Sequence, residues 1–191
     1  MEFEIPTDQQ TESTFQVIAT SGHLEIAILE EVGAEDIPAL VEVSESLADK
    51  FGASARLNPQ TIRKYFDYPH TYPFVARLYG KIIGYIIGVP LEHFRDDLWS
   101  HFDENLGKGN TMYTYAFAFK KQFHKTGYAK TLKRIFYSRM RKNKVRFISG
   151  HVIQGMTRQF SGPARVIKTF DDWHGTGLVF EYYRRPLRPK K

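Results

Sequence analysis

The segment that most constrains the fold is a strand pattern at residues 111–119 followed by a helical pattern at residues 129–142. In the first, Tyr113, Tyr115, Phe117 and Phe119 alternate with smaller side chains, which predicts a strand with one large and one small face. In the second, apolar side chains recur three and four residues apart, as on an amphipathic helix. A strand that leads through a short loop into a helix predicts a mixed α/β (α+β) domain.

The flanking segments extend this pattern. An alternating segment at 23–29 predicts the first strand, and two helix starts follow it, one at 35–38 and one where Asn58 precedes Pro59. Apolar runs at 74–78 and 82–89 around a glycine turn predict an antiparallel hairpin. After the central helix we expect a strand at 145–153, a helical turn at 155–160, and a closing hairpin of 164–170 with 178–183. The predicted order is strand, helix, helix, three strands, helix, strand, helix, two strands, with about seven strands in one mostly antiparallel sheet.

Length and composition bound the organisation and location of the protein. A chain of 191 residues suits one core, so we expect a polar N-terminal extension at 1–21 and a single domain at 22–191. The absence of Cys excludes disulfides, thiolate metal sites and a cysteine nucleophile, and we expect no metal. No apolar run approaches the roughly 20 residues of a membrane span, and the start lacks a secretory pattern. We therefore expect a cytoplasmic protein without a membrane partner.

The net charge of +6 is unevenly distributed. Residues 105–170 contain fifteen Lys and Arg and no acidic residue, which indicates an anionic partner. A nucleic acid is one candidate, because residues 120–146 hold eleven basic residues. However, the aromatic residues there lie at helical core spacing rather than in stacking positions. A compact polyphosphate ligand explains the pattern better, so we expect no nucleic-acid partner.

The basic loop at 120–129 is a candidate phosphate site. The N-terminus of the helix that follows offers unpaired backbone N–H groups and a partial positive charge, and Lys120, Lys121 and Lys125 strengthen that field. Gly127 lets a pyrophosphate approach the backbone, and Ala129 keeps the start of the helix open.

With this loop in place, the sequence resembles the GNAT superfamily of acetyl-CoA-dependent N-acetyltransferases. That family's pyrophosphate loop has the pattern Gln/Arg-x-x-Gly-x-Gly/Ala, and His124, Gly127 and Ala129 occupy the matching positions. His124 departs from the usual Gln or Arg. The similarity in the order of elements extends from about His23 to Leu187.

The resemblance implies a GNAT fold with acetyl-CoA as cosubstrate, held between the strands at 111–119 and 145–153. The implied cofactor-binding residues are Ala116, Phe117, Ala118 and Phe119 along the pantetheine arm, and His124, Lys125, Thr126, Gly127, Tyr128, Ala129 and Lys130 around the pyrophosphate. It further implies that a primary amine attacks the thioester directly, without an acyl-enzyme.

The catalytic groups are less well defined. Many family members carry a Glu on the fourth strand as base, but residues 111–119 contain no carboxylate. Tyr115, with Tyr113 beside it, and His151 on the neighbouring strand are the candidates for proton removal. The family's acid, a Tyr after the fifth strand, has no match at 155–160. Tyr182 or Tyr183 from the last strand are alternatives that the sequence does not rank.

Several alternatives stay open from the sequence. The acceptor is a small amine, an amino acid, a protein N-terminus or a lysine side chain, and a homodimer is left open. The segment at 92–108 has the composition of a mobile, substrate-facing insertion, and its acidic residues favour a cationic acceptor. For Trp173 and His174 two interpretations stay open: they line the acceptor mouth, or they belong to a hairpin shaped by its glycines. The missing carboxylate also permits a catalytically degenerate CoA-binding sensor or interaction domain.

Overall fold

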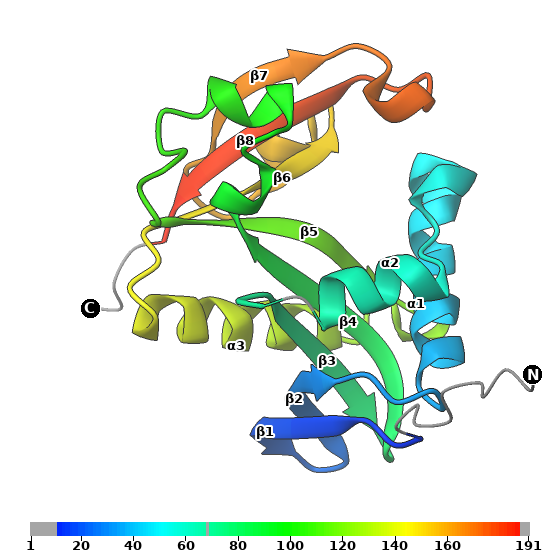
Figure 1. The fold of residues 1–191 in the computed structure, drawn as a ribbon. Helices are drawn as coiled ribbons and strands as arrows, with labels where there is room; N and C mark the ends of the chain where they lie inside the picture. The colour runs from blue at the N-terminus through cyan, green and yellow to red at the C-terminus, as the bar shows by residue number, and fades with distance from the viewer. Residues whose placement is uncertain (1–10, 68, 188–191) are drawn as a thin grey trace, which may run out of the picture.

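The computed structural model describes residues 11–67 and 69–187, which form one eight-stranded sheet (Figure 1). The strands lie in the order β1-β2-β3-β4-β5-β6-β8-β7, and all neighbours are antiparallel except β5 and β6, which are parallel. Their bounds are β1 (Thr14–Ser21), β2 (Leu24–Glu31), β3 (Tyr72–Leu78), β4 (Lys81–Pro90), β5 (Thr111–Phe119), β6 (Phe147–Ile153), β7 (Arg165–Phe170) and β8 (Phe180–Pro186). The predicted mixed α/β architecture is confirmed, with eight strands instead of seven.

The additional strand is β1. It lies within the segment that we predicted to be a polar extension, and it pairs with β2 from Thr14↔Glu31 to Ser21↔Leu24. Because β1 is an edge strand with mostly exposed or half-exposed side chains, its sequence has no alternating pattern of buried residues from which the strand could be predicted. Residues 1–10 of the predicted extension lie outside the described residues.

Three α-helices cover the two faces of the sheet. Helices α1 (Ile37–Phe51) and α2 (Pro59–Phe66) pack on one face, and α3 (Tyr128–Lys142) packs on the other, in two separate apolar clusters. The predicted start of α2 is confirmed, because Asn58 Oδ1 accepts a hydrogen bond from Thr61 N–H at 2.9 Å and completes a capping box. No helix in the described parts of the chain is long and apolar enough to cross a membrane.

Strand β5 has the predicted bounds and contains a β-bulge that the sequence did not predict. Thr114 pairs with Gly88 on β4, whereas Ala116 pairs with the adjacent Ile87, so Tyr115 is an extra residue with no partner across the pair. A bulge of this kind shifts the alternation of side chains by one residue and increases the local twist.

The bulge overturns the predicted faces of β5. Tyr113 packs with Ala116 and Ala118 in the α1/α2 cluster, whereas Phe117 and Phe119 pack in the α3 cluster. The predicted stripe of four aromatic residues on one face was therefore wrong, because strict alternation holds only on each side of Tyr115.

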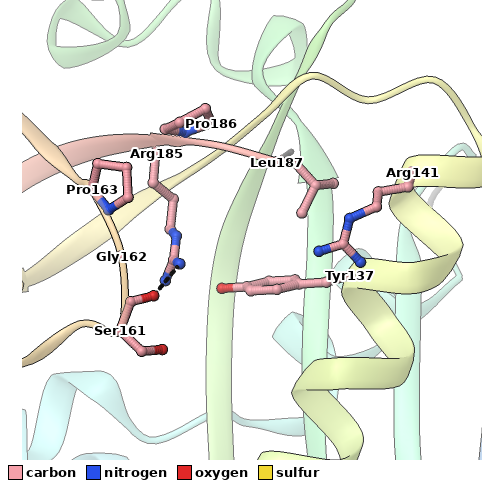
Figure 2. Close-up of a pocket in the computed structure, with 8 residues that line it drawn as sticks. All are labelled: Tyr137, Arg141, Ser161, Gly162, Pro163, Arg185, Pro186 and Leu187. Carbon is pink, nitrogen blue, oxygen red and sulfur yellow. Dashed lines mark hydrogen bonds between the residues drawn. The ribbon is translucent and has the colours of Figure 1, made fainter. Parts of the chain in front are cut away.

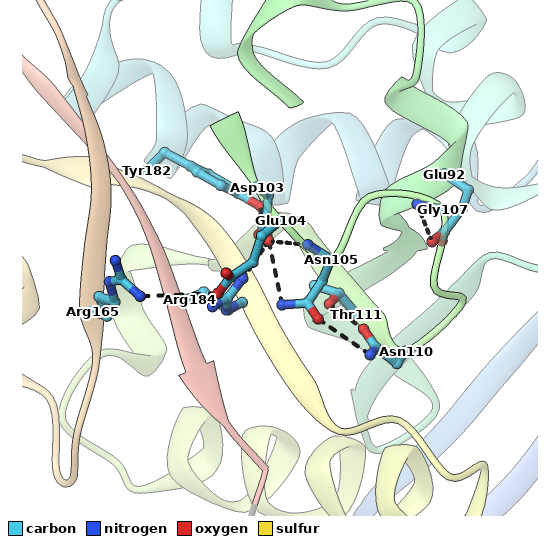
Figure 3. A network of polar contacts seen from close by, with 10 residues as sticks. All are labelled: Glu92, Asp103, Glu104, Asn105, Gly107, Asn110, Thr111, Arg165, Tyr182 and Arg184. Atoms are coloured by element: carbon cyan, nitrogen blue, oxygen red, sulfur yellow. Dashed lines mark hydrogen bonds and ion pairs between the residues drawn. The ribbon is translucent and has the colours of Figure 1, made fainter. Parts of the chain in front are cut away.

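The connection between β4 and β5, residues 91–110, is tied to β8 (Figure 3). It contains two short 3-10 helices, η2 (Leu91–Phe94) and η3 (Leu98–Phe102). The Asp103 carboxylate is fully buried, and it accepts hydrogen bonds from Tyr182 Oη at 2.7 Å and from the Arg184 guanidinium at 2.5 Å. Arg184 also pairs with Glu104 at 2.5 Å. These contacts hold in place a segment that we expected to be a mobile insertion.

The link between β6 and β7 contains one helical turn, as predicted. It is the four-residue 3-10 turn η5 (Met156–Gln159). The Thr157 hydroxyl in this turn donates a hydrogen bond to Glu181 on β8 at 2.7 Å.

Candidate active site

Strands β5 and β6 diverge after three residue pairs, and the gap between them is the predicted cofactor site. The last pair is Tyr113↔Ser149, and from Thr114 onward β5 pairs only with β4. The outer edge of Ala116–Phe119 therefore faces no other strand of the described chain. These four predicted cofactor-binding residues offer backbone N–H and C=O groups to any extended chain that lies alongside.

The N-terminus of α3 follows this free edge after the loop at 120–127. Gly127 precedes the helix with φ +88° and offers no capping side chain, and Thr126 Oγ1 accepts a hydrogen bond from Tyr128 N–H at 3.4 Å. The first backbone bond joins Thr131 N–H to Gly127 O at 3.1 Å, so the N–H groups of Ala129 and Lys130 remain available to an anion. A side-chain carbon built on Gly127 would meet no atom within 4 Å, so the space in front of these groups is open.

The lysines of this loop divide into two groups. Lys120 pairs with Glu42 at 2.7 Å and Lys121 with Asp49 at 2.8 Å, both acidic partners lying on α1. The sequence predicts that Lys120 and Lys121 strengthen the phosphate-binding field, but these acidic partners offset part of their charge. Lys125 and Lys130 have no ion-pair partner within residues 11–67 and 69–187, and they supply the uncompensated charge.

Two side chains shape the loop itself. His124 Nε2 lies 3.0 Å from Phe119 O, and the Thr126 hydroxyl donates to Phe123 O at 2.7 Å. Both contacts are to main-chain carbonyl groups, so the imidazole of His124 and the hydroxyl of Thr126 stabilise the turn.

On the opposite face, Tyr113 and His151 form a hydrogen-bonded pair with 2.9 Å between Tyr113 Oη and His151 Nδ1. The imidazole stacks on Trp173 at 3.8 Å between ring centroids and lies edge-on to Trp99 at 4.9 Å. Burial, with a smaller contribution from His174, lowers the pKa of His151 to about 3, so the imidazole is neutral at physiological pH. The other nitrogen, Nε2, is buried and has no hydrogen-bond partner among the residues that the structure describes.

The second predicted catalytic residue, Tyr115, lies apart from His151. Its ring stacks on Tyr65 of α2 with 3.7 Å between centroids, and burial raises the pKa of its hydroxyl. Tyr113 therefore lies between the two predicted catalytic residues, Tyr115 and His151. Its hydroxyl contacts His151 directly, and the chain reaches the bulge at Tyr115 two residues later.

Tyr182 and Tyr183 point to opposite faces of the sheet. The Tyr182 hydroxyl is bound to Asp103 in the buried network. Tyr183 covers Gly150, since a side-chain carbon on Gly150 would lie 3.3 Å from the Tyr183 hydroxyl and 3.5 Å from Thr114 O. The Tyr183 hydroxyl therefore lies where β5 leaves β6, and burial raises its pKa, which keeps it protonated. Only the three-dimensional structure ranks these two tyrosines.

The loop between β7 and β8 brings Trp173 against His151. Asp172 and His174, on either side of Trp173, have φ values of +53° and +51°, which are uncommon for residues other than glycine. This conformation presents the indole of Trp173 to the imidazole.

Two cavities flank the sheet. One of about 240 Å³ lies on the α3 side, between α3, the loop at 161–163 and the end of β8, where Arg185 donates to Ser161 O at 3.0 Å (Figure 2). The other, of about 200 Å³, lies on the α1/α2 side and is lined by Lys64, Tyr65, Thr71, Val89, His93, Phe94 and Asp97. Among the residues that the structure describes, no group of His and acidic side chains has the arrangement of a metal site.

Comparison with known proteins agrees with this architecture. Solved structures with the same fold include the ribosomal-protein-S18-alanine N-acetyltransferase of Escherichia coli (TM-score 0.63, 10% identity, 88% of this chain and 96% of that chain covered) and Ard1 of Thermoplasma volcanium (0.61, 12%, 87% and 99%). An aminoglycoside 6'-N-acetyltransferase complexed with coenzyme A is also similar (0.51, 8%, 78% and 91%). At these identities the similarity establishes the fold alone. No curated protein matches the sequence.

The fold and the diverging parallel pair thus define a GNAT-type α/β sheet. The sequence model of the acetyltransferase (GNAT) family matches residues 40–156, more than half of the chain. The protein therefore belongs to the GNAT acetyltransferase family.

Proposed function

We propose that the protein transfers the acetyl group of acetyl-CoA to a primary amine. The observation that carries the proposal is the free edge of β5 at 116–119, followed after the loop at 120–127 by the N-terminus of α3, where the N–H groups of Ala129 and Lys130 remain available. A pantetheine arm with its two amide groups suits the edge, and a pyrophosphate suits the N–H groups of the helix. The two sites follow one another in the order that the ligand requires.

The reaction forms one bond and breaks one. The amine nitrogen forms a C–N bond to the thioester carbonyl carbon, the C–S bond breaks, and the electron pair leaves on sulfur. One proton leaves nitrogen and one proton is added to the thiolate, so the products are an amide and CoA with a free thiol. The thioester supplies the activated acyl group, and the protein must orient the amine and move the two protons.

Tyr113 and His151 are placed to orient the water that removes the proton from the amine. A histidine with a pKa near 3 is a weak base at neutral pH, so we assign it a positioning role, in which it fixes the hydrogen bond of Tyr113. Solvent is then the final acceptor of the proton. Tyr115 borders the same space through the bulge, and the network of tyrosines replaces the carboxylate that β5 lacks.

Tyr183 is our candidate for the donor to the leaving thiolate. Its hydroxyl lies at the point where β5 and β6 diverge, and it is protonated at neutral pH. It comes from β8, since residues 154–164 between β6 and β7 contain no tyrosine.

The test combines binding and turnover. Acetyl-CoA at a hundredfold excess over Kd should stabilise the fold by about 2.7 kcal/mol, seen as a rise in Tm, and labelled acetyl-CoA should acetylate at least one member of an amine panel. No rise in Tm rejects the cofactor assignment. Binding without transfer to any amine favours the sensor alternative.

Nucleic acid should bind weakly and lose its affinity steeply as salt rises. A cytoplasmic location and a homodimer stay predictions.

A further inference from the structure

The acidic residues of the β4–β5 connection have unequal roles. Glu92 accepts hydrogen bonds from the N–H groups of Gly107 and Gly109, and Asp103 and Glu104 bind Arg184. Asp96 and Asp97 remain, and neither carboxylate has a hydrogen bond or ion pair with any other described residue. Of these two, only Asp97 lines the cavity of about 200 Å³ on the α1/α2 side.

This cavity adjoins the two β5 tyrosines of the proposed active site. Its wall residue Tyr65 stacks on Tyr115 at 3.7 Å, and its wall residue Phe94 packs on Tyr113 with 4.9 Å between centroids. The negative charge of Asp97 is close enough to Tyr113 to contribute to its raised hydroxyl pKa. An ammonium group attracted by Asp97 is therefore drawn toward the tyrosines next to the β5–β6 gap.

The lining of this cavity combines charged side chains of both signs with apolar side chains. Lys64 also lines the cavity and carries the charge opposite to that of Asp97. Its ammonium group lies 5.2 Å from the centroid of the Tyr65 ring. Val89 and Phe94 are buried and form the apolar part of the lining. Burial lowers the pKa of His93, so this residue adds no positive charge at neutral pH.

The size of the cavity limits the ligand. A volume of about 200 Å³ lies below the range of roughly 300–1,000 Å³ that holds drug-sized ligands. It suits one amino-acid-sized molecule. A ligand with one ammonium, one carboxylate and an apolar side chain matches all three kinds of lining.

We propose that this cavity is the acceptor site and that it takes a free α-amino acid with an apolar side chain. Lys64 holds the carboxylate, Asp97 attracts the ammonium, and the side chain lies against Val89 and Phe94. The proposal rests on the proposed acetyl transfer, whose amine it specifies.

The experiment measures acetylation of L-leucine and L-phenylalanine, each beside its carboxamide, which keeps the side chain and amine and removes the negative charge. Wild-type protein should use each amino acid with a KM at least about tenfold below that of its carboxamide. In Lys64→Met this preference should disappear, through a higher KM for the amino acids alone. In Asp97→Asn the KM should rise for both kinds of acceptor. Lys81→Met and Asp96→Asn, exposed residues that do not line the cavity, are the matched controls and should leave both values unchanged.

Two results separate this inference from the proposed function. Acetylation of the carboxamides as well as or better than the amino acids overturns the amino-acid assignment, points to peptide N-termini, and leaves acetyl transfer standing. If no amine is acetylated, calorimetric binding of L-leucine in the presence of CoA decides: binding that Lys64→Met weakens about tenfold supports the site, and absence of binding overturns it.

Discussion

The two faces of the sheet at the β5–β6 gap differ in the groups they offer to a ligand: one offers backbone groups and the other offers side chains. On the α3 face the proposed cofactor site consists of backbone groups, namely a free strand edge and the N–H groups after Gly127. On the α1/α2 face the proposed acceptor site consists of side chains, among them Lys64, Asp97 and Phe94, and it adjoins Tyr113 and Tyr115. A backbone site tolerates side-chain changes such as His124, provided that the path of the chain is kept. A side-chain site depends on each ring and on the contacts that hold it.

The largest effect is expected from Gly127→Asp. A carboxylate at φ +88° would stand in front of the helix N–H groups, so CoA affinity should fall about a hundredfold, equivalent to about 2.7 kcal/mol, and acetyl transfer should drop below detection. Calorimetry measures the affinity, and urea unfolding measures stability. Gly127→Asn, which tolerates the left-handed conformation and carries no charge, is the matched control and should retain most of the binding. Unchanged CoA affinity in the Asp variant would remove the cofactor site from this face.

Arg184→Met should impair acceptor binding without changing CoA binding. It leaves the buried Asp103 carboxylate without its cationic partner, so we expect unfolding to become easier by about 3–5 kcal/mol. The acceptor KM should rise, while the CoA affinity of the folded fraction should stay near the wild-type value. The double variant Asp103→Leu/Arg184→Met should regain part of the lost stability, because no charge is left buried. A parallel loss of CoA affinity would show that the two faces are not separable.

Tyr183→Phe tests the residue at the junction of the two faces. If Tyr183 protonates the leaving thiolate, kcat should fall about a hundredfold while CoA affinity and stability change little. Tyr182→Phe is the matched control on the same strand. It loses the hydrogen bond to Asp103, so it should cost about 1–3 kcal/mol of stability with a smaller effect on kcat. Equal kcat values for the two variants would contradict the assignment.

The acceptor face should also carry a pH signature. His151 has a pKa of about 3 in the fold and an ordinary value of 6.5, so its contribution is fully present above pH 6.5 and is lost as the pH falls toward 3. Between pH 7 and pH 5 wild-type protein should lose about 2 kcal/mol more stability than His151→Gln, measured by urea unfolding at each pH. Parallel pH curves for the two proteins would mean that His151 titrates normally.

The smallest effects are expected at Lys120 and Lys121. Their ion pairs with α1 lie at the surface, so replacing either by Met should change stability by less than about 1 kcal/mol. CoA affinity should change by less than about threefold, whereas Lys125→Met should lower it further because Lys125 has no competing carboxylate in the described chain. The ranking is measured by calorimetry at one ionic strength.

The sequence predicted features that depend on local signals. The bounds of β5, the Asn58–Pro59 start of α2 and the loop before α3 follow from alternation, capping and glycine. Features that depend on distant partners were missed. The bulge at Tyr115 is set by pairing with β4, and the choice between Tyr182 and Tyr183 is set by Asp103 and Gly150.

The candidate site shows the same division. The run from His124 to Lys130 is contiguous in the chain, so the loop motif could indicate it. The acceptor face joins residues from α2, η3, β5, β6 and the β7–β8 loop, and no window of the sequence contains them together. Charge counts also misled, because the acidic partners of Lys120 and Lys121 lie on α1, more than seventy residues away.

The tie between Asp103 and Arg184 spans 81 positions of the chain and uses the last strand. During synthesis on the ribosome, the α3 side can acquire its loop and helix while β8 is still in the exit tunnel. Until Arg184 emerges, the Asp103 carboxylate in the connection at 91–110 has no cationic partner on β8 and is solvated by water. The contacts that hold this connection are thus completed only after β8 has left the tunnel, and a chain truncated before β8 would carry the loop at 120–127 and α3 without the cationic partner of Asp103.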